Sequence, residues 1–403
     1  MLNLAKMDSE LLSGSNSHSE IGDAVWFNAC MVMYNLYRGE CVIGDGCRFG
    51  RFNLLTVYGG DRIEMGKECL TARNVTIMSD DKHPIFDVAK GKQINRNKNS
   101  RIKVEDKHMK CKLCGSTGSR IIYKGFIRDG GLGRYTDEEV EIYQCPKCNV
   151  IWHEDVVKDL KRYYESEEYR NSLEGTSEEA DFYRLHDKDS AEKFRYTGTT
   201  VFRNKVVADI GCGCGAFLDF VKGVAKEIVA IEPSAAYRQI MERKGFYTYA
   251  YAREACRDRA NAIDVVTSFD VIEHVEDPQQ FIREIYDLLA KNGVAVIGTP
   301  TDTPVMRELL GEIYEKKLLF STQHLWIFSE KNLKMMAEDS GFREPKVRYF
   351  QRYGLGNMLG WVREKEPDSE IQAEFITNTL NQTWISECEC KGMSDYIVLY
   401  LKK

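Results

Sequence analysis

The chain has 403 residues, 43% of them hydrophobic, and a formal net charge of −6. This length suggests two or three domains with substantial cores, and the acidic balance argues against a nucleic-acid partner. No apolar window is long enough for a membrane span, and the N-terminus lacks a signal-peptide core. The 13 cysteines therefore predict a cytoplasmic protein whose thiols serve metal binding or packing rather than disulfides.

The first segment, residues 1–108, is rich in Ile, Val, Gly, Asn and Asp and shows little helical periodicity. Apolar residues recur every six positions at Ile43, Phe49 and Leu55, and again from Val57 onward. A short period of this kind predicts a parallel β-helix, in which each short strand stacks on the next coil.

The repeat resembles the hexapeptide-repeat acyltransferases, a family of left-handed β-helices that commonly form trimers. The match extends through residues 79–87, which look like the long loop of sugar acetyltransferases and make His83 a candidate acyl-transfer base. The resemblance implies a homotrimer. The repeat breaks off after Val104, before the further coils that such enzymes use for acetyl-coenzyme A, so we expect a segment that serves assembly. An active sugar O-acetyltransferase remains the alternative.

Two cysteine pairs define the second segment, residues 109–157. Cys111 and Cys114 form the first pair, and Cys145 and Cys148 form the second. Each pair places two thiolates on one tight turn, and two such turns make a tetrahedral four-sulfur zinc site. Because four sulfurs close the coordination shell, we predict a small zinc ribbon with a structural metal and a β-hairpin between the pairs. His153 is a candidate substitute ligand.

The third segment, residues 158–403, alternates strands and helices, which predicts a doubly wound parallel sheet of the α/β, Rossmann-like class. An apolar strand containing Asp209 leads into a loop with glycines at 211, 213 and 215. Glycines let the backbone turn tightly and let a ligand approach it. The next strand ends in Glu232, and a carboxylate there suits a ribose diol. The glycine pattern alone also fits a dinucleotide fingerprint.

Two features separate this loop from a dinucleotide site. Asp209 stands two residues before the first glycine, and residues 269–278 follow the fourth predicted strand. Together they resemble class I S-adenosylmethionine-dependent methyltransferases. The donor is a sulfonium cation, so an acid at its binding edge is favourable. The resemblance implies that S-adenosylmethionine is bound by Asp209, Gly211, Gly213, Gly215, Glu232, Phe269 and Asp270.

Two histidines are candidate general bases. His274 follows the fourth strand, at the carboxyl edge where such sheets bind ligands. His324 lies in residues 320–329, which resemble the substrate-side motif of sugar methyltransferases, although Gln323 stands where that motif often has an acid. Glu273 is expected to orient a histidine or to cap the following helix.

The order of segments resembles bacterial sugar C-methyltransferases, in which a zinc ribbon precedes the methyltransferase core. We therefore expect a methyltransferase for a nucleotide-linked sugar or a surface-glycan residue, with O-methylation and C-methylation both open. One alternative is a bifunctional enzyme with an active N-terminal sugar O-acetyltransferase. The other is a quinone or other small-molecule O-methyltransferase, because residues 273–278 have counterparts there too.

Overall fold

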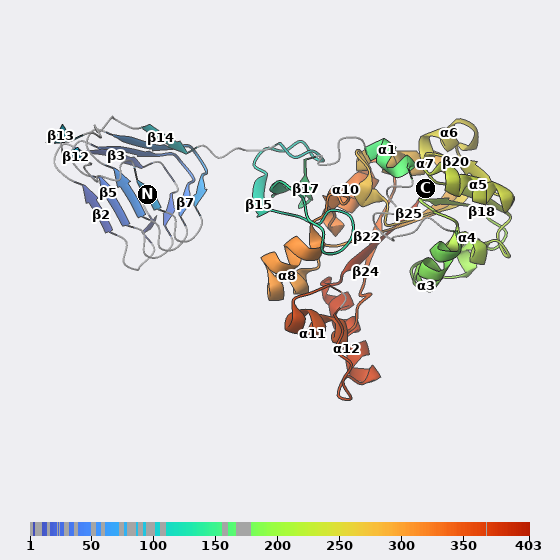
Figure 1. Ribbon diagram of the computed structural model, residues 1–403. Coiled ribbons are helices and arrows are strands. Elements are labelled where there is room, and N and C mark those ends of the chain that lie inside the picture. The colour runs from blue at the N-terminus through green and yellow to red at the C-terminus, as the bar shows by residue number, and fades with distance from the viewer. Residues whose placement is uncertain are drawn as a thin grey trace. The chain divides into compact units, whose positions relative to one another are not determined.

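The structure, a computed structural model, divides into two compact units, Met1–His108 and Met109–Lys403 (Figure 1). In the second unit it describes residues 110–154, 160–166, 179–367 and 369–403. In the first it describes residues 3–4, 10–13, 17–21, 23, 25–27, 32–35, 39–49, 54–57, 61–71, 76–78, 86–87, 92–93 and 101–104. His83 lies outside the described residues.

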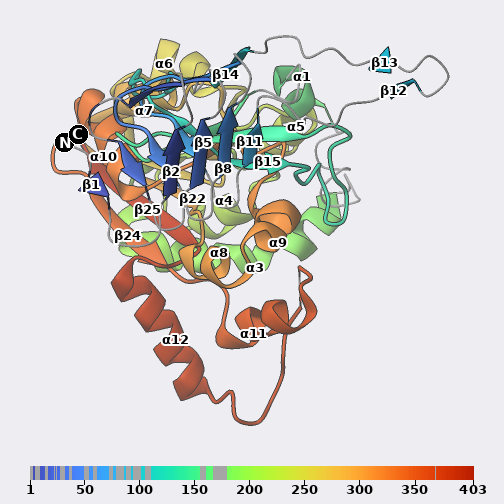
Figure 2. The ribbon, with the colours of Figure 1, turned by 90° about the vertical axis from the view of Figure 1, so that its left-hand side faces the viewer.

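The first unit contains three sheets of parallel strands. One has the order β14 (Arg101–Val104), β9 (Arg62–Met65), β6 (Glu40–Ile43), β3 (His18–Ile21). The second is β11 (Thr76–Met78), β8 (Leu54–Val57), β5 (Val32–Asn35), β2 (Glu10–Ser13), whose strands lie side by side in Figure 2. The third is β1 (Asn3–Leu4), β4 (Trp26–Phe27), β7 (Arg48–Phe49), β10 (Leu70–Thr71). A separate antiparallel pair joins β12 (Phe86–Asp87) to β13 (Lys92–Gln93).

The interior of this unit explains the apolar period. Ile43, Phe49 and Leu55 come from strands of the three different sheets and are buried in one common core. Residues six apart therefore lie on strands of successive sheets. Most paired strands lie 22 residues apart, as Glu40 and Arg62 do, so the full repeat is longer than three six-residue steps.

A seven-stranded sheet forms the centre of the second unit. Its order is β20 (Tyr247–Tyr249), β19 (Glu227–Ile231), β18 (Val206–Ile210), β21 (Ile263–Phe269), β22 (Leu289–Pro300), β25 (Tyr396–Lys402), β24 (Lys346–Phe350). Strand β25 runs in the opposite direction to the other six strands of this sheet. The strand order reverses between β18 and β21, and in such sheets ligands bind outside the carboxyl ends of the strands at that point.

Helices cover both faces of this sheet. One face packs against α3 (Glu179–Thr197), α4 (Ala216–Val221) and α5 (Ala235–Arg243). The other packs against α6 (Ala252–Arg259), α7 (Pro278–Leu288) and α10 (Glu330–Asp339). The remaining described helices are α1 (Leu160–Glu165), η1 (Thr200–Phe202), η2 (Ile272–His274), α8 (Pro304–Leu310), α9 (Glu312–Tyr314), η3 (Glu315–Leu319), α11 (Leu355–Glu364) and α12 (Asn378–Lys391).

Helix α7 illustrates how the sequence sets these elements. The Asp277 side chain accepts a hydrogen bond from the backbone N–H of Gln280, and Pro278 occupies the first turn, so the start of the helix is fixed. Ile282 and Ile285 lie three residues apart on the face toward the sheet and are fully buried. Each such side chain contributes about 1.5–3 kcal/mol of burial free energy.

The cysteine segment belongs to the same compact unit as the doubly wound sheet. Its strands β15 (Arg120–Gly125), β16 (Val140–Gln144) and β17 (Ile151–His153) form an antiparallel sheet. This sheet is completed by β23 (Trp326–Ile327), which pairs with β17 although it lies far downstream in the chain. We call residues 110–154 the ribbon. Within the described residues, no helix is both long enough and apolar enough to cross a lipid bilayer.

Candidate active site

The glycine loop connects β18 to α4. Gly211, Gly213 and Gly215 all adopt positive φ, at 75°, 56° and 79°. A Cβ atom on Gly211 would lie 2.3 Å from Val271 Cγ2, and one on Gly215 would lie 2.5 Å from Met241 Sδ. Glycine is therefore required here both by backbone conformation and by close packing.

Valine in place of Gly213 is expected to weaken S-adenosylmethionine binding by roughly 10- to 100-fold, because a β-branched residue at positive φ costs about 1–3 kcal/mol. The Gly213 N–H also donates to Glu232 Oε2 at 2.9 Å, so a shifted loop would disturb that carboxylate. Calorimetric titration measures the change. The matched control is Gly223→Val, because a Cβ atom at Gly223 meets open space. Equal affinities in both variants would contradict the placement of the donor on this loop.

The two acids predicted for the donor site have different surroundings. Glu232 is buried and holds the loop through both oxygens, since Oε1 accepts the Ser234 N–H at 3.0 Å while Oε2 accepts the Gly213 N–H. Asp209 is also buried and accepts the Thr267 hydroxyl at 2.7 Å. Burial raises the pKa of Asp209. The Asp209 side chain lines neither of the two cavities at the carboxyl edge of the sheet, whereas Glu232 lines one of them.

These two cavities meet at the carboxyl end of β21. The smaller cavity, of about 540 Å³, lies beside Glu232 and residues 250–253. The larger cavity, of about 670 Å³, is lined by Gly213 and Phe269. Both are lined by Gly211, Asp270 and His274. Asp270 adopts a φ of 57°, a backbone conformation that is uncommon outside glycine and is concentrated at functional sites. A ligand in one cavity can therefore meet a ligand in the other at this point.

The predicted catalytic residues come together at this meeting point. Glu273, His274 and His324 each place a side-chain polar atom within 4.8 Å of the others, and the two imidazole rings lie 4.9 Å apart, edge to face. His274 Nδ1 lies 2.8 Å from the Gln323 carbonyl oxygen and 2.9 Å from the Tyr164 hydroxyl. A carbonyl oxygen can only accept, so Nδ1 carries the proton. In the neutral ring, Nε2 is then the basic nitrogen.

Burial changes the protonation of the groups beside His274. It lowers the pKa of His324 well below the ordinary histidine value, with the charges of His274 and Arg128 acting in the same direction. Burial, followed by the charge of Asp270, raises the pKa of Glu273 to about 8. Glu273 Oε2 accepts the Thr299 hydroxyl at 3.0 Å, and Oε1 lies 3.9 Å from His274 Nε2. At neutral pH the free protein therefore holds a neutral His324 and a largely protonated Glu273.

The raised pKa of Glu273 predicts a pH dependence of stability. Between the ordinary carboxyl value and about 8, the folded state keeps a proton that the unfolded state has released. Stability is therefore greatest at low pH within this window and falls as the pH rises, by on the order of 4 kcal/mol. Chemical denaturation at about pH 5 and about pH 8.5 measures the difference, which Glu273→Gln should largely remove. Glu276→Gln, at an exposed position, serves as control. If the unfolding free energy of Glu273→Gln changed with pH as much as that of the wild type, the raised pKa of Glu273 would be refuted.

Sequence reasoning missed several side chains that line the larger cavity. Arg352 Nη1 lies 3.8 Å from Asp270 Oδ1, and Arg352 Nε lies 3.7 Å from Asp395 Oδ2. The Arg352 guanidinium also lies over the Tyr396 ring, 4.2 Å from its centroid. Arg128 reaches the same cavity from the ribbon. No local pattern marks these residues, because they converge from strand ends and loops that are distant in sequence.

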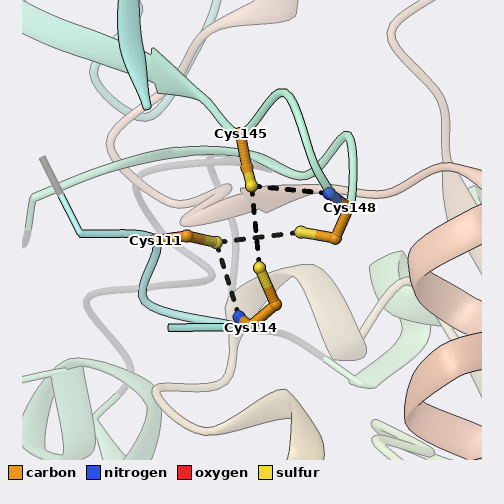
Figure 3. A group of neighbouring side chains, drawn as sticks. All are labelled: Cys111, Cys114, Cys145 and Cys148. Atoms are coloured by element: carbon orange, nitrogen blue, oxygen red, sulfur yellow. Dashed lines mark hydrogen bonds between the residues drawn. The ribbon is translucent and has the colours of Figure 1, made fainter. Parts of the chain in front are cut away.

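The four cysteine sulfurs form a cluster in the ribbon. Cys111 Sγ lies 3.7 Å from Cys148 Sγ, and Cys114 Sγ lies 3.6 Å from Cys145 Sγ. All four side chains point toward a common centre (Figure 3). Disulfides are excluded, because a bonded pair of sulfurs lies about 2.05 Å apart. His153 is not part of this cluster of ligand atoms.

Comparisons with known proteins show what this chain is similar to. Residues 184–344 match the model of a methyltransferase domain. The chain is 29% identical over 109 residues to a ubiquinone biosynthesis O-methyltransferase of Caulobacter, covering 25% of this chain and 43% of that protein. It is 29% identical over 185 residues to the protein of the same name in Ruegeria pomeroyi, covering 43% and 71%. The chain thus spans about half the length of the curated relatives it matches.

The solved structures also include a match. A methyltransferase of Archaeoglobus fulgidus, described as dependent on S-adenosylmethionine, is 17% identical with a TM-score of 0.39, over 55% of this chain and 97% of that one. The match to the family model makes residues 184–344 a methyltransferase domain.

Proposed function

We propose that this chain, which carries an S-adenosylmethionine-dependent methyltransferase domain, methylates a hydroxyl group of a small organic acceptor. The observation that carries the proposal is the position of His274 where the two cavities meet. A base at that point can remove the acceptor's proton while the methyl donor lies in reach. The smaller cavity, beside Glu232 and the glycine loop, would hold the adenosine part of the donor.

Methyl transfer to a hydroxyl requires the chain to align the acceptor and to remove its proton. The bound donor supplies a methyl group already activated on a sulfonium, so the protein must bring the acceptor oxygen into line and remove its proton. His274 Nε2 takes the proton, and the charge that forms on the ring is stabilised by the Gln323 carbonyl oxygen, 2.8 Å from Nδ1. Glu273 Oε1 lies 3.9 Å from Nε2, so an ionised Glu273 would stabilise the same charge, whereas the protonated form that prevails at neutral pH does not. His324 is the alternative base, and burial lowers its pKa, which makes it a weaker base than an ordinary histidine.

For the acceptor we favour a ring hydroxyl of the quinol or phenol type. This choice rests on the curated relatives, several of which are named ubiquinone biosynthesis O-methyltransferases. A phenolic hydroxyl is also acidic enough for a histidine to deprotonate it as the methyl group moves. The aromatic rings of Phe269 and Tyr396 line the larger cavity and could pack against such an acceptor.

A second candidate acceptor is a sugar hydroxyl, and the charges of the larger cavity favour it. Arg352, Asp270 and Asp395 all line this cavity, and their carboxylates and guanidinium could each bond a hydroxyl of a polyhydroxylated ligand. Both acceptors require the same donor and the same base. They differ only in what fills the larger cavity.

One experiment tests the donor and separates the acceptors. The full chain is titrated with S-adenosylmethionine and then incubated with it and either a dihydroxybenzoate or a nucleoside diphosphate hexose, and the products are analysed by mass spectrometry. Methylated dihydroxybenzoate supports the ring acceptor, and methylated hexose supports the second candidate. Absence of donor binding would overturn the proposal as a whole.

We also propose that the ribbon binds a structural zinc ion through Cys111, Cys114, Cys145 and Cys148. Four sulfurs about 2.3 Å from one zinc in a tetrahedron lie about 3.8 Å apart, and the observed separations of 3.6 and 3.7 Å fit this arrangement. The backbone N–H groups of Cys114 and Cys148 each donate to the first sulfur of their own pair at 3.4 Å, which supports thiolate character there. The trimer and the acyl transfer inferred from the first unit stay predictions.

A further inference from the structure

The ribbon holds the segment that carries His324. Strand β17 pairs with β23, which begins two residues after His324. On the N-terminal side of His324, the Arg128 N–H donates to the Phe320 carbonyl at 3.1 Å, and the Thr322 N–H donates to the Arg128 carbonyl at 3.0 Å. We call residues 320–327 the histidine segment. It is therefore fixed to the ribbon on both sides of His324.

His153, at the end of β17, makes the most direct of these contacts. Its side chain is 4% exposed. Its Nε2 atom lies 3.1 Å from the Ser321 carbonyl oxygen and 3.1 Å from the His324 carbonyl oxygen. Both oxygens can only accept, so Nε2 carries a proton and donates to the two carbonyls. One ring thus closes the turn that contains Gln323 and fixes the backbone of His324.

The same turn orients His274. The Gln323 carbonyl that contacts His274 Nδ1 belongs to the peptide between the two carbonyl groups bound by His153. A rotation of this turn would move the acceptor away from Nδ1 and remove the bond that sets the His274 tautomer. His153 itself does not line either cavity of the site, so it acts on the reaction through its neighbours.

We propose that His153 is a positioning residue for methyl transfer, and that through it the ribbon aligns the base at the meeting point of the two cavities. This inference rests on the proposed function. The Ser321–His324 turn connects His153 to both candidate bases. Misplacement of a catalytic group by about 1 Å costs on the order of 10²-fold in rate. Loss of the ring should therefore affect kcat and leave donor binding, which depends on Glu232 and the glycine loop, unchanged.

The test compares His153→Ala and His153→Gln with wild type in the full, zinc-loaded chain. We expect His153→Ala to lower kcat by roughly 10- to 100-fold, with the KM and the calorimetric affinity for S-adenosylmethionine within about twofold of wild type. The Gln side-chain amide keeps a donor, so His153→Gln should recover part of the rate. Lys124→Ala is the control, because the exposed Lys124 on β15 pairs with Glu141 on β16 of the same ribbon.

Two further measurements keep the outcomes distinct. Zinc content shows whether each variant retains an intact ribbon, and if His153→Ala loses metal the comparison rests on His153→Gln. Hydrogen–deuterium exchange of the histidine segment should rise in His153→Ala and stay unchanged in Lys124→Ala. A kcat within twofold of wild type, or unchanged exchange, would overturn the positioning role. If wild type itself transfers no methyl group, the proposed function fails, and the exchange result alone decides whether His153 holds the segment.

Discussion

Replacing His274 by asparagine should lower kcat for methyl transfer by roughly 10²–10⁴-fold, the usual contribution of a general base. The His274 imidazole lies at the meeting point of the two cavities. The Gln323 carbonyl accepts the hydrogen bond from Nδ1 and thereby leaves Nε2 as the basic nitrogen. Asparagine retains a polar side chain of similar reach but offers no base. The affinity for S-adenosylmethionine should change by less than about threefold. Steady-state kinetics and calorimetry on the same preparation separate the two quantities.

The comparison with His324→Asn decides between the two histidines. Burial lowers the pKa of His324 and so weakens it as a base, and we therefore expect its loss to cost less than the loss of His274. His18→Asn, the same substitution in the first unit, is the matched control and should leave kcat unchanged. If His324→Asn is the more damaging variant, the base is His324 and His274 orients it.

Loss of one sulfur from the ribbon should have the largest effect on stability. In Cys148→Ser we expect the full equivalent of bound zinc to disappear and the free energy of unfolding of the second unit to fall by roughly 5 kcal/mol or more. The physical reason is that metal binding in such sites is part of the folding free energy, about 10–16 kcal/mol in isolated finger peptides. Cys148 is buried in the core that the ribbon shares with the doubly wound sheet, so the loss should spread beyond the metal site.

Metal analysis and thermal melting measure this loss. The control is Cys390→Ser, which removes an exposed cysteine outside the cluster and should keep both the zinc content and the melting temperature. A Cys148→Ser protein that retains one zinc ion and melts with wild type would show that the four sulfurs do not form a metal site.

The features that could be predicted are those that depend on a residue and its near neighbours in the sequence, such as the glycine loop. Gly211, Gly213 and Gly215 require positive φ, and such a requirement is visible in the sequence because only glycine meets it readily. The six-residue period likewise identified interior residues such as Ile43 and Phe49. It did not predict the 22-residue separation of paired strands, because turn lengths between strands leave no apolar signal.

Side-chain direction and long-range convergence were not predictable in the same way. Asp209 stands at the expected position in its strand, yet its carboxylate is bonded to Thr267 inside the sheet, and a strand's register alone does not say which neighbour satisfies a polar group. Arg352 and Arg128 reach the larger cavity from segments more than 200 residues apart in the numbering. Only the fold brings such residues together.

The pairing of β17 with β23 has a consequence for synthesis of the chain. His153 and its carbonyl partner at His324 are separated by 171 residues, so at about 5–20 residues per second the ribosome needs roughly 10–30 s to deliver the second after the first. During this interval the cysteine pairs can already be present, while the outer edge of β17 has no strand to pair with. An unpaired strand edge invites association with other chains. Early capture of a metal ion by the cysteines would keep the nascent ribbon compact until β23 emerges and pairs with β17.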